Sequence, residues 1–215
     1  MMKIELPVYT TKLPVSKDII EFTPLVVKEE KNIIAAKETG NKKDGLNTLL
    51  KILQNKTGKA MSSLSETDVI HLILELRKKS IGEKFSTSFV CPKSKENIQV
   101  NINLADIKLE GSCTEANLKF DNMKIKLRIP SNFSSISSAI YSIETEEEKL
   151  TLENLSENEK EKLIDSFPVS TLREIEEKVK SFYHYKYVID YTSDEVNRRI
   201  TLSSAEDFFT LLFVM

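Results

Sequence analysis

Residue types that commonly build catalytic and cofactor sites are scarce in this 215-residue chain. It has two cysteines, two histidines, five glycines and no tryptophan. Two cysteines cannot form a disulfide scaffold, and so few glycines leave little room for loops that cradle phosphates. No G-x-S-x-G, P-loop, G-x-G-x-x-G or H-E-x-x-H motif occurs. We therefore predict a protein that is not an enzyme and that binds no cofactor.

An alternative is an enzyme whose site is assembled from residues scattered along the chain. Its candidate residues are His71, His184, Cys91 and Cys113, which share no motif. His71 lies next to Leu72 on a predicted helix, and His184 lies among tyrosines on a predicted strand, so both suit ordinary structural positions. Catalysis needs such groups to converge in one cleft, and a structure tests whether they do.

The charge argues against a generic nucleic-acid binder, and the hydropathy argues against a membrane-spanning protein. The chain carries 31 Lys and Arg against 33 Asp and Glu, which gives a formal net charge of −2. A generic nucleic-acid binder is expected to be strongly basic. The longest apolar run, residues 208–215, is much shorter than the roughly 20 residues that span a bilayer, and residues 1–7 lack the apolar run of a secretory signal. We expect no nucleic-acid partner, no membrane span and a cytoplasmic, reducing location.

The pattern of apolar residues predicts an α+β fold in which helices pack with several antiparallel β-hairpins. Apolar residues make up 40% of the chain, which is enough to fill a core. Ser65 and Asp68 form a capping-box pattern at the start of the clearest helix. The predicted hairpins cover residues 8–23, 85–104, 116–129 and 183–202, and the predicted helices cover 25–40, 46–58 and 65–82, with further helices beginning near Ser156, Ser170 and Ser203.

A change of character after Pro130 gives a candidate domain boundary. The chain reads there as helical, and residues 144–148 form an acidic run typical of a mobile, solvated loop. We predict an N-terminal part, residues 1–130, with the first hairpin, helices and knuckle-like hairpins. The second part, residues 131–215, holds a helical segment, the last hairpin and a terminal helix. The alternative is that both parts form one compact unit.

Two of the predicted hairpins resemble zinc ribbons that lack the metal ligands. Cys91-Pro92-Lys93-Ser94 has the spacing of a zinc knuckle, with serine where a second cysteine would stand. A shift of 98 positions aligns this hairpin with the last one, which suggests a duplication, but the second turn has no cysteine. A structural zinc ion needs about four thiolate or imidazole ligands. We therefore predict no metal site.

A basic stripe runs along one predicted strand. Lys124, Lys126 and Arg128 alternate with apolar residues and so share a face, with Lys119 on the neighbouring strand. One interpretation is an ordinary solvated face. The alternatives are contact with an acidic partner or a nucleic-acid-binding module, which predicts salt-dependent retention on heparin.

The end of the chain is apolar on nearly every side of its predicted helix. We predict that Phe208, Phe209, Leu212 and Phe213 contact a partner, because burying all sides of a helix usually needs a second surface. The alternative is a last helix that packs entirely within the chain.

Several segments, in order along nearly the whole chain, match motifs of one known protein family. One is residues 22–31, F-T-P-L-V-V-K-E-E-K, and the others are residues 76–83, Cys91-Pro92 with residues 103–107, Pro130-Ser131, and Asp207-Phe208-Phe209. These segments resemble baseplate hub assembly proteins of T-even-like tailed bacteriophages, whose opening reads F-R-P-F-L-V-K-E-E-K. Relatives often carry cysteine pairs in the turns of both hairpins, whereas this chain keeps only Cys91.

The resemblance implies a viral, non-enzymatic protein of the baseplate hub of a contractile tail. It implies either an assembly chaperone or a hub structural subunit that acts by protein–protein contacts. The expected partners are other baseplate hub proteins or tape-measure proteins, and a homo-oligomer stays open. The implied location is the cytoplasm of the bacterial host during assembly and, for a subunit, the tail baseplate of the virion.

Overall fold

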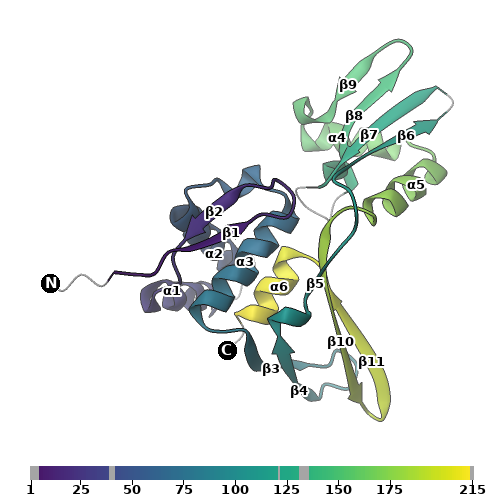
Figure 1. Cartoon of the computed structure of the whole chain (residues 1–215). Coiled ribbons are helices and arrows are strands. Elements are labelled where there is room, and N and C mark those ends of the chain that lie inside the picture. The colour runs from purple at the N-terminus through teal and green to yellow at the C-terminus, as the bar shows by residue number, and fades with distance from the viewer. Residues whose placement is uncertain (1–4, 39–41, 121, 131–135, 214–215) are drawn as a thin grey trace. The chain divides into compact units, whose positions relative to one another are not determined.

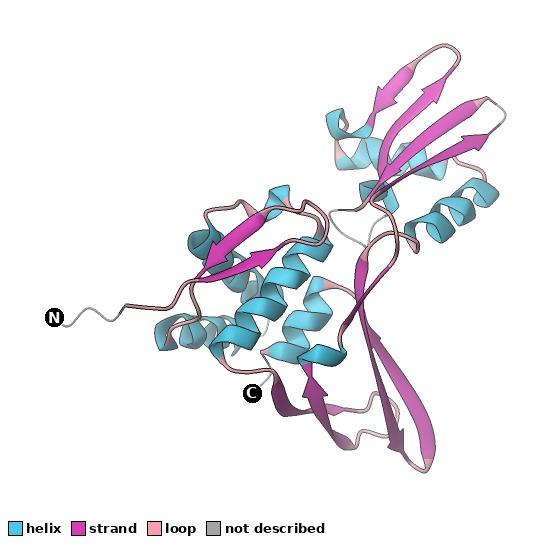
Figure 2. Ribbon diagram, in the orientation of Figure 1, coloured by secondary structure: helices cyan, strands magenta, loops and turns pink. Residues whose placement is uncertain are grey.

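A computed structural model describes residues 5–38, 42–120, 122–130 and 136–213, and it has the predicted α+β fold (Figures 1 and 2). The chain divides into two compact units. Unit 1 comprises Met1–Lys108 and Tyr185–Met215, and unit 2 comprises Leu109–His184. Unit 2 is therefore an insertion in the sequence of unit 1. Among the described residues, no helix has both the length and the hydropathy needed to cross a membrane.

Helix α3 (Glu66–Ser80) is the centre of the unit 1 core. Its Leu72, Ile73 and Leu76 are almost inaccessible to solvent. The Ser65 hydroxyl accepts a hydrogen bond from the Asp68 amide, at 3.2 Å, which confirms the serine half of the predicted capping box. The Asp68 carboxylate instead accepts from the Val15 and Ser16 amides. The other helices of this unit are α1 (Val27–Glu38), α2 (Lys42–Thr57), α6 (Ala205–Leu212) and two short 3₁₀ turns, η1 (Met61–Ser63) and η2 (Leu104–Asp106).

Helix α6 packs against α3 and is held at both ends by charged side chains of α3 (Figure 1). The Ala205 amide donates to the Glu66 carboxylate at 2.8 Å, and the Arg77 guanidinium donates to the Leu212 carbonyl at 3.0 Å. Arg77 also lies over the Phe85 ring, 4.7 Å from its centroid. A carboxylate at the start of a helix and a cation at its end both favour the helix dipole.

Where it is described, unit 1 also contains three antiparallel hairpins, in which side chains directed at the core alternate with side chains directed at solvent. In the second, Phe85, Phe89, Val100 and Ile102 pack against the core. The first hairpin is β1 (Tyr9–Lys12) with β2 (Ile19–Phe22), the second is β3 (Lys84–Val90) with β4 (Asn97–Asn103), and the third is β10 (His184–Ser193) with β11 (Val196–Leu202). A short strand, β5 (Lys108–Glu110), begins at the last residue of the first segment of unit 1 and continues into unit 2.

The described part of unit 2 is a four-stranded antiparallel sheet packed with two helices. The strands are β6 (Glu115–Phe120), β7 (Met123–Arg128), β8 (Ile140–Thr145) and β9 (Lys149–Thr151), in that order across the sheet. The helices are α4 (Glu157–Asp165) and α5 (Val169–Val179), and the 3₁₀ turns are η3 (Ile136–Ala139) and η4 (Leu152–Asn154). The core joins sheet residues such as Ile125 and Leu127 to Ile175 of α5 and to Phe182.

One glycine allows two backbone segments of unit 2 to approach closely. Gly111 has φ +93°, and a Cβ atom there would lie 2.1 Å from the Phe182 carbonyl oxygen. The Ser112 amide donates to the Ser181 carbonyl at 3.0 Å, and the Tyr183 amide donates to the Cys113 carbonyl at 3.1 Å. The segment after β5 thus runs against the segment after α5 with no space for a side chain between them.

The prediction that the chain turns helical after Pro130 is wrong for residues 140–151. Ile140–Thr145 and Lys149–Thr151 form a hairpin that continues the sheet of β6 and β7. The acidic run is the turn of this hairpin, where the Thr145 amide donates to the Glu148 carbonyl at 2.9 Å. The strand character of this segment comes from pairing with β7, a tertiary effect that local composition does not indicate. Residues 131–135, also part of the prediction, lie outside the described residues.

Two boundaries also differ from expectation. Helix α5 begins at Val169 with Pro168 as its N-cap residue, so Ser170 lies inside the helix and does not cap it. The proposed domain boundary after residue 130 falls within unit 2. The helices after it bury their apolar faces against β6 and β7, which precede it, whereas the last hairpin and α6 pack in the core of unit 1.

Candidate functional site

The turn between β3 and β4 has a defined six-residue geometry. The Cys91 amide donates to the Glu96 carbonyl at 2.8 Å, and the Lys95 amide donates to the Cys91 carbonyl at 2.9 Å. Lys95 has φ +65°. The Cys91 side chain has no solvent-accessible area. The knuckle-like segment noted in the sequence is thus a tight turn closed around its own cysteine.

The first hairpin of the chain repeats this turn. The Leu13 amide donates to the Asp18 carbonyl at 2.9 Å, and Lys17 has φ +66°. The two turns read L-P-V-S-K-D and C-P-K-S-K-E, with proline, serine, lysine and an acidic residue at matching positions. This similarity, at a shift of 78 positions, is visible in the sequence, but the shared turn geometry was not predicted from it.

Each turn directs consecutive backbone amides at one acceptor. In the first turn, the Asp68 carboxylate accepts from the Val15 amide at 2.8 Å and from the Ser16 amide at 3.1 Å. In the second turn, the acceptor is the Cys91 sulfur. Hydrogen bonds from the Ser94 side chain and backbone lower the pKa of the Cys91 thiol to about 6, with a further contribution from the Lys93 amide. Successive backbone amides form a concavity that favours an anion.

The turn of the second hairpin packs against the third hairpin through polar side chains. The Cys91 sulfur lies 3.6 Å from the Tyr191 hydroxyl, and the hydroxyl oxygens of Ser94 and Ser193 lie 2.5 Å apart. Ser193 donates to the Glu96 carboxylate at 2.6 Å, and this hydrogen bond lowers the pKa of Glu96. At the place where a zinc ribbon joins two hairpins through a metal, these hairpins are joined by hydrogen bonds.

The other chemistry-bearing residues named from the sequence each have structural partners. His71 is hydrogen-bonded at both ring nitrogens, to the Thr11 hydroxyl and to the Tyr185 hydroxyl, each at 2.7 Å. In unit 2, Nδ1 of His184 lies 2.8 Å from the Phe182 carbonyl oxygen, and the Cys113 sulfur lies 3.5 Å from the Ser181 carbonyl oxygen. Within the described ranges, no group of three or more His, Cys, Asp and Glu residues is placed to hold a metal ion.

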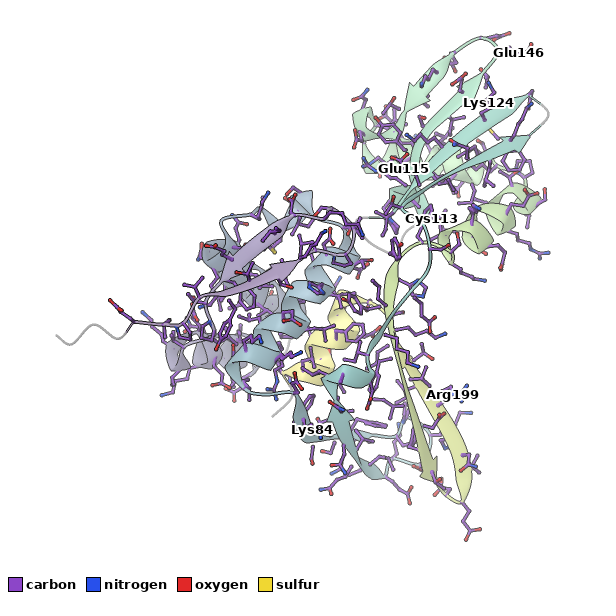
Figure 3. The ribbon with its side chains drawn as sticks, viewed as in Figure 1. Lys84, Cys113, Glu115, Lys124, Glu146 and Arg199 are labelled. Atoms are coloured by element: carbon purple, nitrogen blue, oxygen red, sulfur yellow. The ribbon has the colours of Figure 1, made fainter. Side chains whose placement is uncertain are left out.

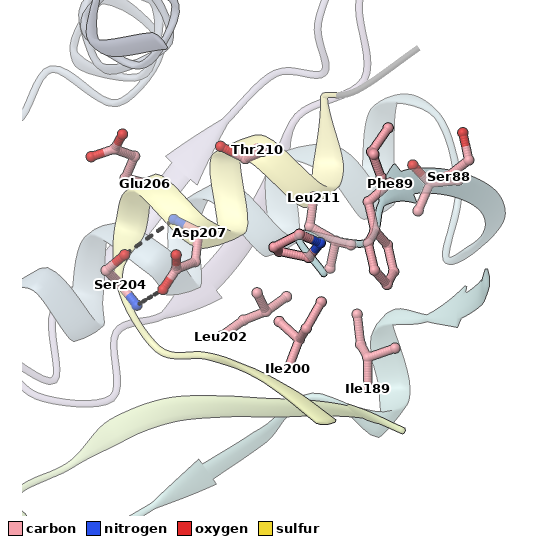
Figure 4. A pocket seen from close by; sticks show the side chains of 13 residues that line it. Ser88, Phe89, Ile189, Ile200, Leu202, Ser204, Glu206, Asp207, Thr210 and Leu211 are labelled. Carbon is pink, nitrogen blue, oxygen red and sulfur yellow. Dashed lines mark hydrogen bonds between the residues drawn. The ribbon is translucent and has the colours of Figure 1, made fainter. Parts of the chain in front are cut away.

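Beside the joined turns, unit 1 has a mainly apolar cavity of about 290 Å³ (Figure 4). Phe89, Ile189, Ile200, Leu202 and Leu211 surround it, and Figure 4 shows Ser88 at one end and Ser204 with Glu206 at the other. Among the described residues, the lining comprises Thr87, Ser88, Phe89, Val90, Pro92, Ile189, Ile200, Leu202, Ser204, Glu206, Asp207, Thr210 and Leu211.

The apolar residues predicted to contact a partner lie in the unit 1 core instead. Phe208, Phe209, Leu212 and Phe213 of the last helical segment are each 5% exposed or less. The alternative in which the last helix packs within the chain therefore describes this fold. The sequence prediction underestimated how completely α2, α3 and the hairpins surround α6, and these four residues offer no exposed contact surface.

The basic stripe of unit 2 is matched by acidic side chains. Figure 3 labels Lys124 of the stripe and Glu115 of the neighbouring strand. Lys126 pairs with Glu115 at 3.0 Å, and Lys124 lies 3.6 Å from Glu144. Arg128 pairs with Glu153 at 2.5 Å. This arrangement favours the interpretation as a solvated face over nucleic-acid binding, because phosphate contacts would have to displace these carboxylates.

The fold and the site define an α+β protein whose paired hairpins are joined by hydrogen bonds at their turns and flank an apolar cavity. A family model described as "T4 bacteriophage base plate protein" matches residues 6–210, and the chain belongs to this family. It is thus a phage baseplate protein, as the resemblance at the level of sequence segments implied. Comparisons with curated proteins and with solved structures find no match.

Proposed function

We propose that this baseplate protein serves the central hub of the baseplate, as an assembly chaperone or as a hub structural subunit, and that it acts by protein–protein contacts without catalysis. The observation that carries the proposal is the family match over residues 6–210, which includes parts of both units. The collinear hub-like segments support the finer assignment to the hub.

The arrangement of reactive groups agrees with a contact function. His71 is hydrogen-bonded at both ring nitrogens, and the buried Cys91 thiol is enclosed by its own turn. General acid–base or nucleophilic catalysis needs an activated group facing a cleft that a substrate enters. The apolar lining of the unit 1 cavity suits packing of side chains better than such chemistry.

The nucleic-acid alternative receives no comparable support. The stripe residues Lys124, Lys126 and Arg128 have carboxylate partners, and the formal net charge is −2. The remaining stripe residue, Lys119, lies directly opposite Lys124 in the sheet. Retention on heparin that falls steeply with salt would contradict the contact proposal and favour the alternative.

Two measurements test the proposal. Native mass spectrometry of the chain co-expressed with the hub and tape-measure proteins of the same phage should give a complex, and failure to form one with any of them would refute it. Quantitative mass spectrometry of purified virions separates the two roles. Stoichiometric detection identifies a subunit in the tail baseplate, whereas absence from virions together with a complex in the host cell identifies a chaperone.

A further inference from the structure

The unit 1 cavity runs along the edge of strand β3. Successive side chains of a strand point to opposite faces, so a cavity over one face would be lined by alternate residues. Here four consecutive residues, 87–90, line it, and no residue of β4 does. The cavity therefore follows the edge of β3 that lies opposite β4. Among the described residues, β3 has no strand partner other than β4, so this edge is not covered by another strand.

The backbone groups at this edge follow from the hydrogen-bond pattern of the hairpin. At one end, the Cys91 amide donates to the Glu96 carbonyl at 2.8 Å. At the other end, the Leu104 amide donates to the Glu83 carbonyl at 2.9 Å. Hydrogen-bonded and non-hydrogen-bonded pairs alternate along an antiparallel ladder. Cys91 with Glu96 and Glu83 with Leu104 are therefore hydrogen-bonded pairs, and counting inward from either one gives the same alternation for the pairs between them.

Ser88 and Val90 occupy non-hydrogen-bonded positions in this ladder, opposite Gln99 and Asn97. Their amides and carbonyls consequently point away from β4, toward the cavity. Val90 is also 60% exposed, so no other part of the described chain covers this end of the strand. An edge with outward amides and carbonyls is a template for another extended backbone.

The cavity has the size and lining for side chains of such a backbone. Its volume of about 290 Å³ is roughly twice that of a 150 Å³ protein cavity that holds benzene. Ile189, Ile200 and Leu202 of the third hairpin and Leu211 of α6 form its apolar walls. Alternate side chains of a strand beside β3 would point toward these walls, and the volume accommodates about two of them.

One end of the cavity is acidic. Glu206 is exposed there, and the neighbouring Asp207 uses its carboxylate to accept from the Ser203 and Ser204 amides, at 3.1 and 3.0 Å. Two carboxylates at one end of an apolar groove complement a positive charge. A lysine or arginine at that end of the bound segment therefore fits the charge of the site.

We infer that the unit 1 cavity, a groove along the free edge of β3, binds one extended segment of a partner baseplate protein. This segment adds a strand to that edge, places alternate apolar side chains in the cavity and sets a basic residue near Glu206. The inference rests on the proposed function, since it names the surface through which contact is made. Strand addition takes its affinity from main-chain hydrogen bonds and its specificity from pockets for alternate side chains.

The test uses hydrogen–deuterium exchange on the full chain, free and in each complex found with co-expressed baseplate proteins of the same phage. The outward amides of Ser88 and Val90 should exchange quickly in the free chain and become protected in the complex. The amide of Gln99 points outward from the other edge of the hairpin, and it should stay unprotected.

A matched pair of proline variants tests the hydrogen bonds themselves. Ser88→Pro removes an outward amide at the cavity and leaves the ladder with β4 intact, because proline is tolerated where the amide faces away from the partner strand. Gln99→Pro makes the same change on the outer edge of β4. Losing one hydrogen bond at the interface should weaken the complex about tenfold for Ser88→Pro, and Gln99→Pro should bind as wild type. Circular dichroism verifies that both variants fold.

Two further variants test the cavity and its charge. Ile200→Phe should fill part of the cavity and weaken the complex, while Glu206→Lys should weaken it most at low salt, where charge attraction is least screened. Two outcomes would refute binding at this cavity and leave the proposed function standing. One is a complex that forms while the Ser88 and Val90 amides stay unprotected, and the other is a Ser88→Pro variant that binds the partner as well as wild type does. A dimer of this chain with those amides already protected also refutes binding at this cavity. Absence of any complex refutes both.

Discussion

Replacing Gly111 by alanine should selectively destabilise unit 2. Gly111 has φ +93°, a conformation that L-residues rarely adopt. An added Cβ would lie 2.1 Å from the carbonyl oxygen and 2.5 Å from the carbonyl carbon of Phe182. Both atoms belong to the backbone, so a rotamer change cannot relieve the overlap and the two segments must separate.

The expected cost has two parts. A non-glycine residue with positive φ costs about 1–2 kcal/mol. Separating the segments also loses the hydrogen bonds from Ser112 to Ser181 and from Tyr183 to Cys113, at about 0.5–1.5 kcal/mol each. The total is therefore about 2–5 kcal/mol. Gly58→Ala is the matched control, because Gly58 has φ +67° but no atom within 4 Å of its added Cβ, which leaves only the first part.

Hydrogen–deuterium exchange with peptide resolution measures both variants in the full chain. Because each 1.4 kcal/mol changes an opening equilibrium about tenfold, the slowest amides of β7 and α5 should exchange about 30-fold to several thousand-fold faster in Gly111→Ala. The α3 amides of unit 1 serve as the internal reference and should not change. If Gly111→Ala costs unit 2 no more than Gly58→Ala costs unit 1, the close approach of the two backbone segments is incorrect.

Three further changes test unit 1. Asp68→Asn leaves one of its two turn amides without a strong acceptor and should cost about 1–3 kcal/mol in chemical denaturation; an unchanged midpoint would show that the carboxylate does not hold the first turn. The pKa of Cys91 is lowered to about 6 from its ordinary 9.0, so its ionised form stabilises the fold fully above pH 9, and this stabilisation is lost as the pH falls through 6. In Cys91→Ser, the melting temperature should depend less on pH over this range. An equal dependence on pH in both proteins would count against a buried thiolate. Burial lowers the pKa of His71, so wild type should lose stability as the pH falls below 6.5, while His71→Gln should lose less. A larger loss in the variant would contradict the lowered pKa of His71.

Local patterns predicted the elements that carry their own signals. The Ser65 cap, the alternation along β3 and β4 and the start of a helix near Ser203 each depend on residues within a few positions, and all three are present. The hairpin after Pro130 carried no such signal, because β8 is a strand through its pairing with β7. The same reason explains the domain boundary, since packing between residues far apart in sequence determines which elements share a core.

The candidate site was also predicted only where its features depend on local sequence. The sequence predicted the knuckle-like turn at Cys91, the lack of a second ligand at Ser94 and the similarity of two hairpins. It did not predict that Tyr191 and Ser193 face that turn, because contacts about 100 positions apart leave no local pattern. Phe208 and Phe209 were predicted to contact a partner for a related reason. Hydropathy shows that a helix must be covered, but it does not show by what.

The insertion of unit 2 has a consequence for the order of events during translation. The strands and helices of unit 2 are contiguous in sequence, so they are complete while the ribosome is still synthesising β10, β11 and α6. At typical elongation rates, α6 leaves the ribosome roughly 5–20 s after β5. Until then, the apolar face of α3 against which α6 packs is not covered by that helix. A nascent chain of this protein therefore completes unit 2 before unit 1, and the α3 face stays open until α6 arrives. This interval is the period in which the chain is most exposed to misassembly.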